Sequence, residues 1–417
     1  QMCIRDSFSC FQYKDIMKMS FKERLLAAAT LSALAAFSTL SEAADVRMYG
    51  IIDTGIIVEH NKMGTADSQT SAREEFGINL GPRIGLRGSE DLGNGTKVKF
   101  LLESLFESDN GAMRFNRLWG GEASVALEGP YGEIALGRMG ALTSPFGHWG
   151  VYGLEATPFG FGWGRSGGVH WMVGGDRLDN AVSYASPVMG PGVQLFAQYS
   201  LQSGSNPAPG VERTSDRENT RRASLGVRVR TEGFTTVATV DRILNPHGSS
   251  DGAVLAYGED TTIGSLTVNF PVVQNVRLYV MGQVFRNVYN APGTPVHSAK
   301  KLIGGGLAEG NASGIAGRGF DGWIAGVSAD VKIWGGNLYL TTAYDDWEYK
   351  GAVKAGQETN LKRYLVGAAF EYPLAKRTHL YASGNWTHGS GLFDTKNFSD
   401  SSDPNSTQVM AGITHFF

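Results

Sequence analysis

The chain has 417 residues, of which 18% are charged, 42% are hydrophobic, 56 are glycine and only 14 are proline. This composition excludes a disordered chain, which is poorer in apolar residues, and a collagen, in which glycine is every third residue. The formal net charge of −3 excludes the strongly basic field that nucleic-acid binding uses. A long chain that is rich in glycine and poor in proline is typical of a large β protein with many turns.

The first 43 residues are expected to be absent from the folded protein. Residues 17–43 have a basic start, an apolar stretch from Leu25 to Leu40 and a small-residue cleavage pattern at Ser41 to Ala43, which predict a cleaved secretory signal peptide. Residues 1–16 fit no such signal, so we interpret them as an extraneous or untranslated prefix. The folded domain is then 44–417. It lacks both cysteines and so forms no disulfide, and it is slightly more negative than the full chain.

Alternation with a period of two dominates the remaining sequence. From Arg73, one face carries a series of mostly apolar residues: Phe76, Ile78, Leu80, Pro82, Ile84 and Leu86. The other face carries Arg83 and Arg87. A turn at 91–95 leads into a second alternating run, in which Lys97 and Lys99 lie opposite Val98 and Phe100. Each run is therefore predicted to be a strand with one apolar and one polar face.

Short turns and long loops alternate along the whole domain. The sequence predicts seven short turns, at 91–95, 129–132, 189–192, 231–233, 271–275, 334–336 and 373–377. It predicts eight longer polar segments, near 61–73, 107–116, 140–177, 202–219, 245–259, 288–319, 348–360 and 389–406. Fifteen connections join about sixteen strands. An antiparallel meander sorts all short turns to one end and all long loops to the other, which indicates a transmembrane antiparallel β-barrel.

The two ends of the domain are expected to pair with each other. Lipid offers no hydrogen bonds to the backbone, so a membrane-spanning sheet must close on itself. Closure brings the first strand, "VRMYGIIDTGIIVEH", beside the last, "TQVMAGITHFF". An aromatic residue such as Phe417 at the membrane boundary fits the interfacial girdle of such barrels.

Five segments taken together resemble the general porins of the β-proteobacterial and neisserial type. They are "YGIIDTG", "PRIGLRGSEDLGNGTKVKF", "GPYGEIALGR", "RLDNAVSYASP" and the terminal "AGITHFF". The resemblance implies a homotrimeric, sixteen-stranded pore in the bacterial outer membrane, in contact with lipid and lipopolysaccharide. It implies passive diffusion of small hydrophilic solutes and ions, without enzymatic activity or cofactor. It also implies that Phe417 belongs to the signal that the barrel assembly machinery reads.

In such porins the third long loop folds into the lumen and narrows it. Here that loop runs from about Gly140 to Asp176 and holds seven aromatic residues: Phe146, Trp149, Tyr152, Phe159, Phe161, Trp163 and Trp171. Aromatic side chains of that number need a surface to pack against, which favours the inward position. The alternative is an external hydrophobic cap between subunits.

Charged side chains are expected to set ion selectivity at the constriction. By the resemblance, Arg83 and Arg138 fall at wall positions that carry a basic cluster. Glu155, the only acid of the loop before Asp176, is also assigned to the constriction, together with Asp176 and Arg177. In a regular strand Arg138 would lie on the same face as the apolar Ile134 and Leu136. It therefore faces inward only if its strand ends or bulges at that point. Further residues are expected on the lumen wall: Arg87, Lys99, Arg228 and Arg230. A basic wall opposite a nearly neutral loop predicts a mild preference for anions.

Three other functions compete with a general pore. An aromatic track along the loop would suit a substrate-specific channel for sugars or aromatic acids. An outer-membrane barrel enzyme would need a catalytic set, and His170 with Ser166 and Asp176 is the nearest approach to one. A soluble secreted β protein does not explain the sorted loops. No pattern of metal ligands is evident in the sequence.

Overall fold

A computed structural model describes most of the domain. The described residues are 45–62, 68–202, 220–244, 249–250, 253–254, 259–288, 319–351, 358–391 and 405–417. The predicted prefix and signal peptide lie outside them, as do large parts of the predicted loops after residue 202. No helix in these residues is long and apolar enough to cross a membrane.

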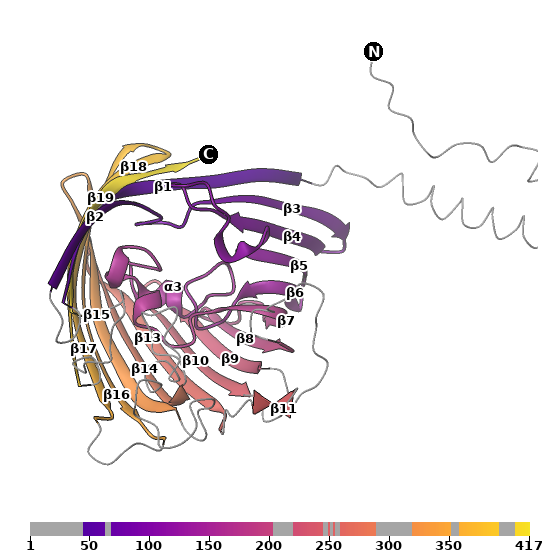
Figure 1. Ribbon diagram of the computed structural model, residues 1–417. Coiled ribbons are helices and arrows are strands. Elements are labelled where there is room, and N and C mark those ends of the chain that lie inside the picture. Colours follow the sequence, from indigo (N-terminus) through magenta and orange to yellow (C-terminus); the bar gives the residue numbers. More distant parts are fainter. Residues whose placement is uncertain are drawn as a thin grey trace, which may run out of the picture. The chain divides into compact units, whose positions relative to one another are not determined.

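Antiparallel strands make up nearly all of the regular structure (Figure 1). The main sheet contains β1 (Asp45–Lys62), β2 (Ser68–Phe76), β3 (Arg83–Gly93), β4 (Thr96–Leu105), β5 (Glu122–Gly129), β6 (Gly132–Gly140), β7 (Arg177–Ala185), β8 (Val193–Ser200), β9 (Arg221–Arg230), β10 (Thr235–Leu244), β13 (Thr261–Val273), β14 (Val276–Val288), β15 (Phe320–Ile333), β16 (Gly336–Tyr349), β17 (Asn360–Ala375), β18 (Thr378–Gly391) and β19 (Ser406–Phe416). A separate short pair consists of β11 (Ser249–Ser250) and β12 (Ala253–Val254).

The sheet closes into a barrel. From β3 to β19 each strand of the main sheet pairs with the next one, and β1 pairs with β2, β3 and β19. The closing register places Gly55 opposite Gly412 and Val58 opposite Val409. Because β2 and β3 both pair with β1, they are two parts of one pass through the sheet. The seventeen strands of the main sheet therefore make sixteen passes, as the sequence predicts.

The long strand predicted from Arg73 is interrupted. β2 ends at Phe76, Gly77 adopts a φ of 64°, and β3 begins only at Arg83. The Asp53 carboxylate holds this kink by accepting hydrogen bonds from the backbone N–H groups of Asn79 (3.3 Å) and Leu80 (3.2 Å). The prediction that Ile78 shares the outer face with Phe76 and Ile84 is therefore wrong, because the kink turns Ile78 into a buried inner cluster.

All seven predicted short turns join antiparallel neighbours. At the first of them, Asn94 and Gly95 have φ values of 53° and 72°, which suits the left-handed backbone of a tight hairpin. The predicted loop near 61–73 is shorter than expected, because β2 already begins at Ser68.

The two faces of the barrel differ as the alternation predicts. The outer face exposes apolar side chains along many strands, for example Val125, Leu225, Val284 and Val409. Positions between them on the same strands, such as Ser124, Ser224 and Gln408, face inward. At the seam, Phe417 and Gly50 exchange backbone hydrogen bonds of 3.0 and 3.1 Å, so the terminal residue pairs with the first strand.

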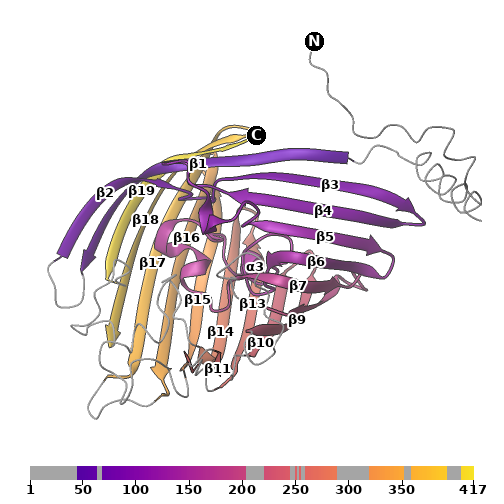
Figure 2. The same ribbon diagram turned by 45° about the vertical axis from the view of Figure 1, so that its right-hand side comes forward.

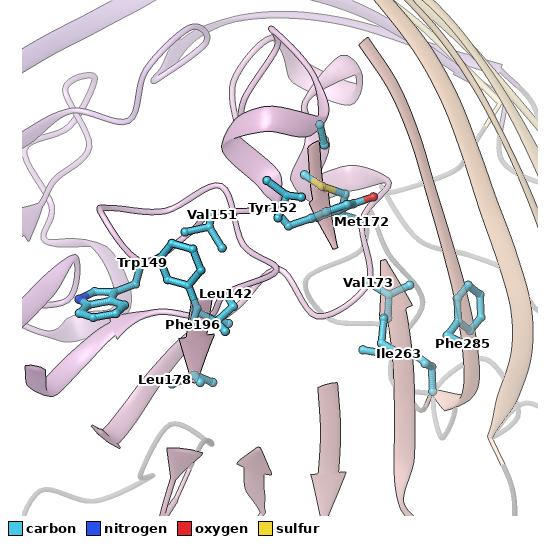
Figure 3. Packing of buried hydrophobic residues seen from close by; sticks show 14 of the residues in the cluster. Leu142, Trp149, Val151, Tyr152, Met172, Val173, Leu178, Phe196, Ile263 and Phe285 are labelled. Carbon is cyan, nitrogen blue, oxygen red and sulfur yellow. The ribbon is translucent and has the colours of Figure 1, made fainter. Parts of the chain in front are cut away.

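Buried apolar residues form two clusters on the inner side. The larger joins the segment after β6 to strands β5–β8, β10 and β13–β17. Figure 3 shows Leu142, Trp149, Val151, Tyr152, Met172 and Val173 of that segment beside Leu178, Phe196, Ile263 and Phe285 of the strands. In both views the short helix α3 (Gly153–Ala156) lies on the concave side of the sheet (Figure 1, Figure 2).

Candidate pore constriction

The segment 141–176 joins β6 to β7 and is attached to the barrel along its length. Near its start, the N–H of Leu142 donates to Gln198 of β8 at 3.1 Å. At α3, the carbonyl of Glu155 accepts from the amide of Asn269 of β13 at 3.0 Å. Beyond α3, the N–H of Arg165 donates to Gln408 of β19 at 2.9 Å. These attachments reach strands from opposite halves of the chain.

A buried ion pair fixes the two ends of this segment. Arg222 of β9 and Asp241 of β10 are almost fully buried and lie 2.8 Å apart. The hydroxyl of Thr143 donates to Asp241, and the guanidinium of Arg222 donates to the carbonyl of Gly174 at 3.0 Å. A single pair of wall residues thus holds both the start and the end of the segment. Paired charges with satisfied hydrogen bonds tolerate such burial.

Aromatic packing fixes the middle of the segment. Trp163 lies edge-on to Tyr381 of β18 at 5.4 Å between ring centroids, and 5.9 Å from Tyr339 of β16. Phe159 packs against both Trp163 and Tyr339. The backbone N–H of Trp163 also donates to the backbone carbonyl of Ile78 in the kink after β2. The middle of the segment is therefore packed against the stretch of wall that runs from the kink after β2, through the seam, to β16.

A second connection, 106–121 between β4 and β5, contributes arginines to the same region. It includes the 3₁₀ turn η1 (Arg114–Asn116). Arg117 pairs with Asp179 of β7 at 2.8 Å, and Arg138 of β6 pairs with the same carboxylate at 2.7 Å. Burial lowers the pKa of Arg114 below its usual value, while the charges of Glu107 and Glu75 act in the opposite direction. These contacts join the second connection to β6 and β7.

Arg83 and Arg138 both contact carboxylates of neighbouring strands in this region. Arg83 pairs with Glu103 of β4 at 3.3 Å, and its side chain is only 13% exposed. The register between β6 and β7 shifts after Gly137, which has a φ of 131°. That irregularity meets the condition set for Arg138, whose side chain is 14% exposed and donates to the carbonyl of Gly120.

The three other predicted constriction residues have different surroundings. Arg177 begins β7 and stacks on the ring of Phe146, with 3.9 Å from its guanidinium carbon to the ring centroid. Glu155 pairs with Arg230 and accepts a hydrogen bond from Asn269. Asp176 is mostly exposed and lies 3.9 Å from Arg222. Glu155 and Asp176 are therefore engaged with β9 and not with Arg83 or Arg138.

The four predicted wall residues all have partners at inner positions. Arg87 lies over the ring of Tyr49, and Arg228 lies over the ring of Phe196. Lys99 pairs with Glu128 and Glu133, each at 2.8 Å, and Arg230 pairs with Glu155. Two of the four, Lys99 and Arg230, are thus paired with carboxylates, which the sequence did not indicate.

Several site residues were missed by the sequence reading: Glu103, Arg114, Arg117, Asp179 and Arg222. The run "MRFNR" at 113–117 places two arginines in a short loop and was the one available signal. The acids and Arg222 lie within strands, where their partners come from other parts of the chain.

Two residues of the rival catalytic set, Ser166 and Asp176, have different surroundings. Ser166 is buried, whereas Asp176 is 73% exposed and lies beside Arg222. Within the part of the chain that the structure describes, no group of three or more His, Cys, Asp or Glu residues could hold a metal ion.

Comparison with known proteins gives a consistent result. The model of the Gram-negative porin family matches residues 27–392. An outer membrane porin protein of Bordetella pertussis is 28% identical over 95% of this chain and all of its own length. The major outer membrane protein P.IB of Neisseria gonorrhoeae is 26% identical over 88% of this chain and 94% of its own.

A solved structure, the anion-selective porin from Comamonas acidovorans, matches with a TM-score of 0.60 and 19% identity. The match covers 90% of this chain and all of that one, and at this identity it supports the fold. The relatives are channel proteins and not enzymes, in keeping with the closed barrel. This chain belongs to the Gram-negative porin family and forms a diffusion channel in the outer membrane.

Proposed function

We propose that the channel prefers anions and that the segment 141–176 forms its constriction together with the arginines of β3, β6, β7 and the 106–121 connection. The observation that carries this proposal is a group of five arginines that form ion pairs with only two carboxylates. Arg83 has Glu103, and Arg117 and Arg138 share Asp179. Among the described residues, Arg114 and Arg177 form no ion pair. Arginines without an ion-pair partner in a narrow passage with low-dielectric walls attract anions more strongly than the same groups on an open surface.

The attachments of the segment support an inward position. It contacts inner-face residues of β8, β13, β16, β18 and β19, and both of its buried ends bind the Arg222–Asp241 pair. An external cap would leave those inner positions without these partners. The Comamonas acidovorans relative is itself named an anion-selective porin, in line with the same preference.

The test is the reversal potential in a salt gradient across a planar bilayer. Replacing Arg83 and Arg138 with glutamine removes two positive charges, so the reversal potential should shift toward cation preference while the barrel still folds. Lys376→Gln, in the short turn between β17 and β18, is the control for loss of a basic residue. An unchanged reversal potential in the double variant would refute the basic wall but not the channel.

We further propose the remaining partners and boundaries. Residues 17–43 are removed as a signal peptide and 1–16 are not part of the mature protein. The barrel assembles as a homotrimer in contact with lipopolysaccharide, and the barrel assembly machinery recognises Phe417. The apolar outer face supports contact with lipid and with other subunits. Mass spectrometry of the purified protein would establish the first residue, and gel migration without heating would establish the trimer.

A further inference from the structure

Three arginines and four phenylalanines alternate at the proposed constriction. They form what we call the arginine–phenylalanine ladder, in the order Phe76, Arg114, Phe115, Arg177, Phe146, Phe161 and Arg83. The guanidinium carbons lie between 3.9 and 5.9 Å from the ring centroids, and the two neighbouring rings are 5.5 Å apart. These distances fall within the range of cation–π attraction. The members come from β2, β3, β7 and both connections, so the tertiary fold assembles the ladder.

Two arginines of the ladder have N–H groups that donate to no acceptor among the described residues. Within the described residues, Arg114 and Arg177 donate no side-chain hydrogen bond and form no ion pair. A guanidinium stacked on a ring keeps its N–H groups in its own plane, where a carboxylate can accept two of them. The charges that act most strongly on Arg177 are the carboxylate of Glu103, which attracts it, and the guanidinium groups of Arg83, Arg138 and Arg114, which add positive charge around it. The free donors therefore point to an anionic ligand.

Phe115 supplies an apolar surface between those two charges. Its ring lies 5.2 Å from the guanidinium carbon of Arg114 and 5.9 Å from that of Arg177. Its side chain is nevertheless 53% exposed, and its backbone has a φ of 60°. A bulky residue rarely adopts this left-handed conformation, and such strain persists where the surroundings impose it. The backbone conformation holds an exposed ring where a passing anion would meet it.

We propose that the ladder is a binding site for aromatic carboxylates, with the carboxylate on Arg114 and Arg177 and the aryl ring against Phe115. This inference rests on the proposed anion preference and gives it a solute class. An inorganic anion would use only the guanidinium groups, and an aliphatic carboxylate would gain no ring–ring contact. An aromatic carboxylate uses both halves of the site, so it binds more tightly than an aliphatic acid of similar size.

Block of single-channel chloride current by benzoate tests the proposal, with cyclohexanecarboxylate and acetate as comparison probes. In the wild type, half-block by benzoate should need a concentration roughly threefold to tenfold lower than half-block by cyclohexanecarboxylate. Phe115→Leu keeps an apolar side chain and Arg177→Lys keeps the charge, yet each should remove most of this difference. Leu118→Ala, at an exposed position of the same connection, is the matched control and should retain it.

The outcomes separate this proposal from the anion preference. Because Phe115→Leu leaves every charge in place, and Phe115 is not one of the arginines proposed to set selectivity, its reversal potential in a salt gradient should stay close to that of the wild type. Equal block by benzoate and cyclohexanecarboxylate in the wild type would overturn the proposed site. An unchanged benzoate advantage in both variants would also overturn it. A wild-type channel without anion preference that still discriminates benzoate would refute the proposed selectivity and leave the ladder intact.

Discussion

At the scale of single residues, the contacts of the site depend on partners that lie far apart in sequence. Glu371 of β17 accepts from the amide of Asn79 in the kink at 3.0 Å and contacts His379 at 2.9 Å. Tyr381 donates to Asp53 at 2.9 Å, so the carboxylate that holds the kink also bonds to β18. A change of one of these residues therefore affects segments on both sides of the barrel seam.

Gly50 is a residue whose lack of a side chain can be tested. A Cβ atom at this position would collide with the ring of Phe417, which lies over the glycine. We expect Gly50→Val to displace the terminal ring, weaken the pairing of β1 with β19 and lower the amount of barrel in the outer membrane severalfold. Quantitative blotting of outer-membrane fractions measures this.

A matched control for that variant is Gly264→Val in β13. The nearest atom to a Cβ there is 3.4 Å away, which is an ordinary contact, so this variant should assemble normally. Equal loss of assembly in both variants would show that strand glycines matter in general and that the ring of Phe417 has no special role.

At the scale of elements, the sequence predicted strands and short turns well and the kink poorly. Asn94 and Gly95 predict a tight hairpin because few other residue pairs adopt its left-handed backbone conformation. The kink at 77–82 follows no such local signal: apolar residues keep alternating through Ile78 and Pro82, and the carboxylate that turns the chain is Asp53, on another strand. Local periodicity cannot report a bend that a distant side chain imposes.

The segment 141–176 gives a prediction at this scale. Deleting Gly153 to Gly168 removes α3 together with Phe159 and Trp163, which pack against β16 and β18. If the segment narrows the lumen, the deletion should raise single-channel conductance and weaken ion selectivity. A conductance equal to that of the wild type would show that the segment does not limit the passage.

The two faces of β9 lead to a further prediction, about stability. Leu225 is 61% exposed on the outer face near the middle of the strand. Leu225→Arg should lower the free energy of unfolding in lipid bilayers by roughly 2–4 kcal/mol, because a charge there must enter hydrocarbon. Arg228→Ala, at an inner position that water reaches, should cost much less. Urea titration of the two variants compares them, and similar costs would contradict the assigned faces.

At the scale of the whole molecule, the closed order of strands could be predicted, whereas the composition of the constriction could be predicted only in part. The sorted turns and loops require a closed meander, whatever the details of each strand. The ladder, by contrast, brings together β2, β3, β7 and two connections, and its order follows from packing between segments that have no common sequence pattern. The alternation of faces along its strand marks Arg83 as a wall residue. Arg114 lies in a loop, where side chains follow no such alternation, so the sequence did not indicate it.

Closure itself can be tested with introduced cysteines. Val58 and Val409 are partners across the β1–β19 seam and both are exposed on the outer face. Mature barrel with Val58→Cys and Val409→Cys should form a disulfide on mild oxidation, and the cross-linked chain should migrate faster than the reduced chain after unfolding. Val58→Cys with Val240→Cys, two exposed positions that are not paired, should stay uncrosslinked.

The attachment of the segment 141–176 to strands that follow it in sequence also constrains the order of assembly. Its contacts with Asn269, Tyr339, Tyr381 and Gln408 involve residues that are synthesised and exported later than the segment itself. Contacts of such long sequence separation slow folding, since the chain must come together before they form. The wall against which this segment packs is therefore complete only when the last strands have arrived. If the segment forms the constriction as proposed, the passage reaches its final width at that step. A barrel arrested before that step would be more permeable to solutes than the finished channel.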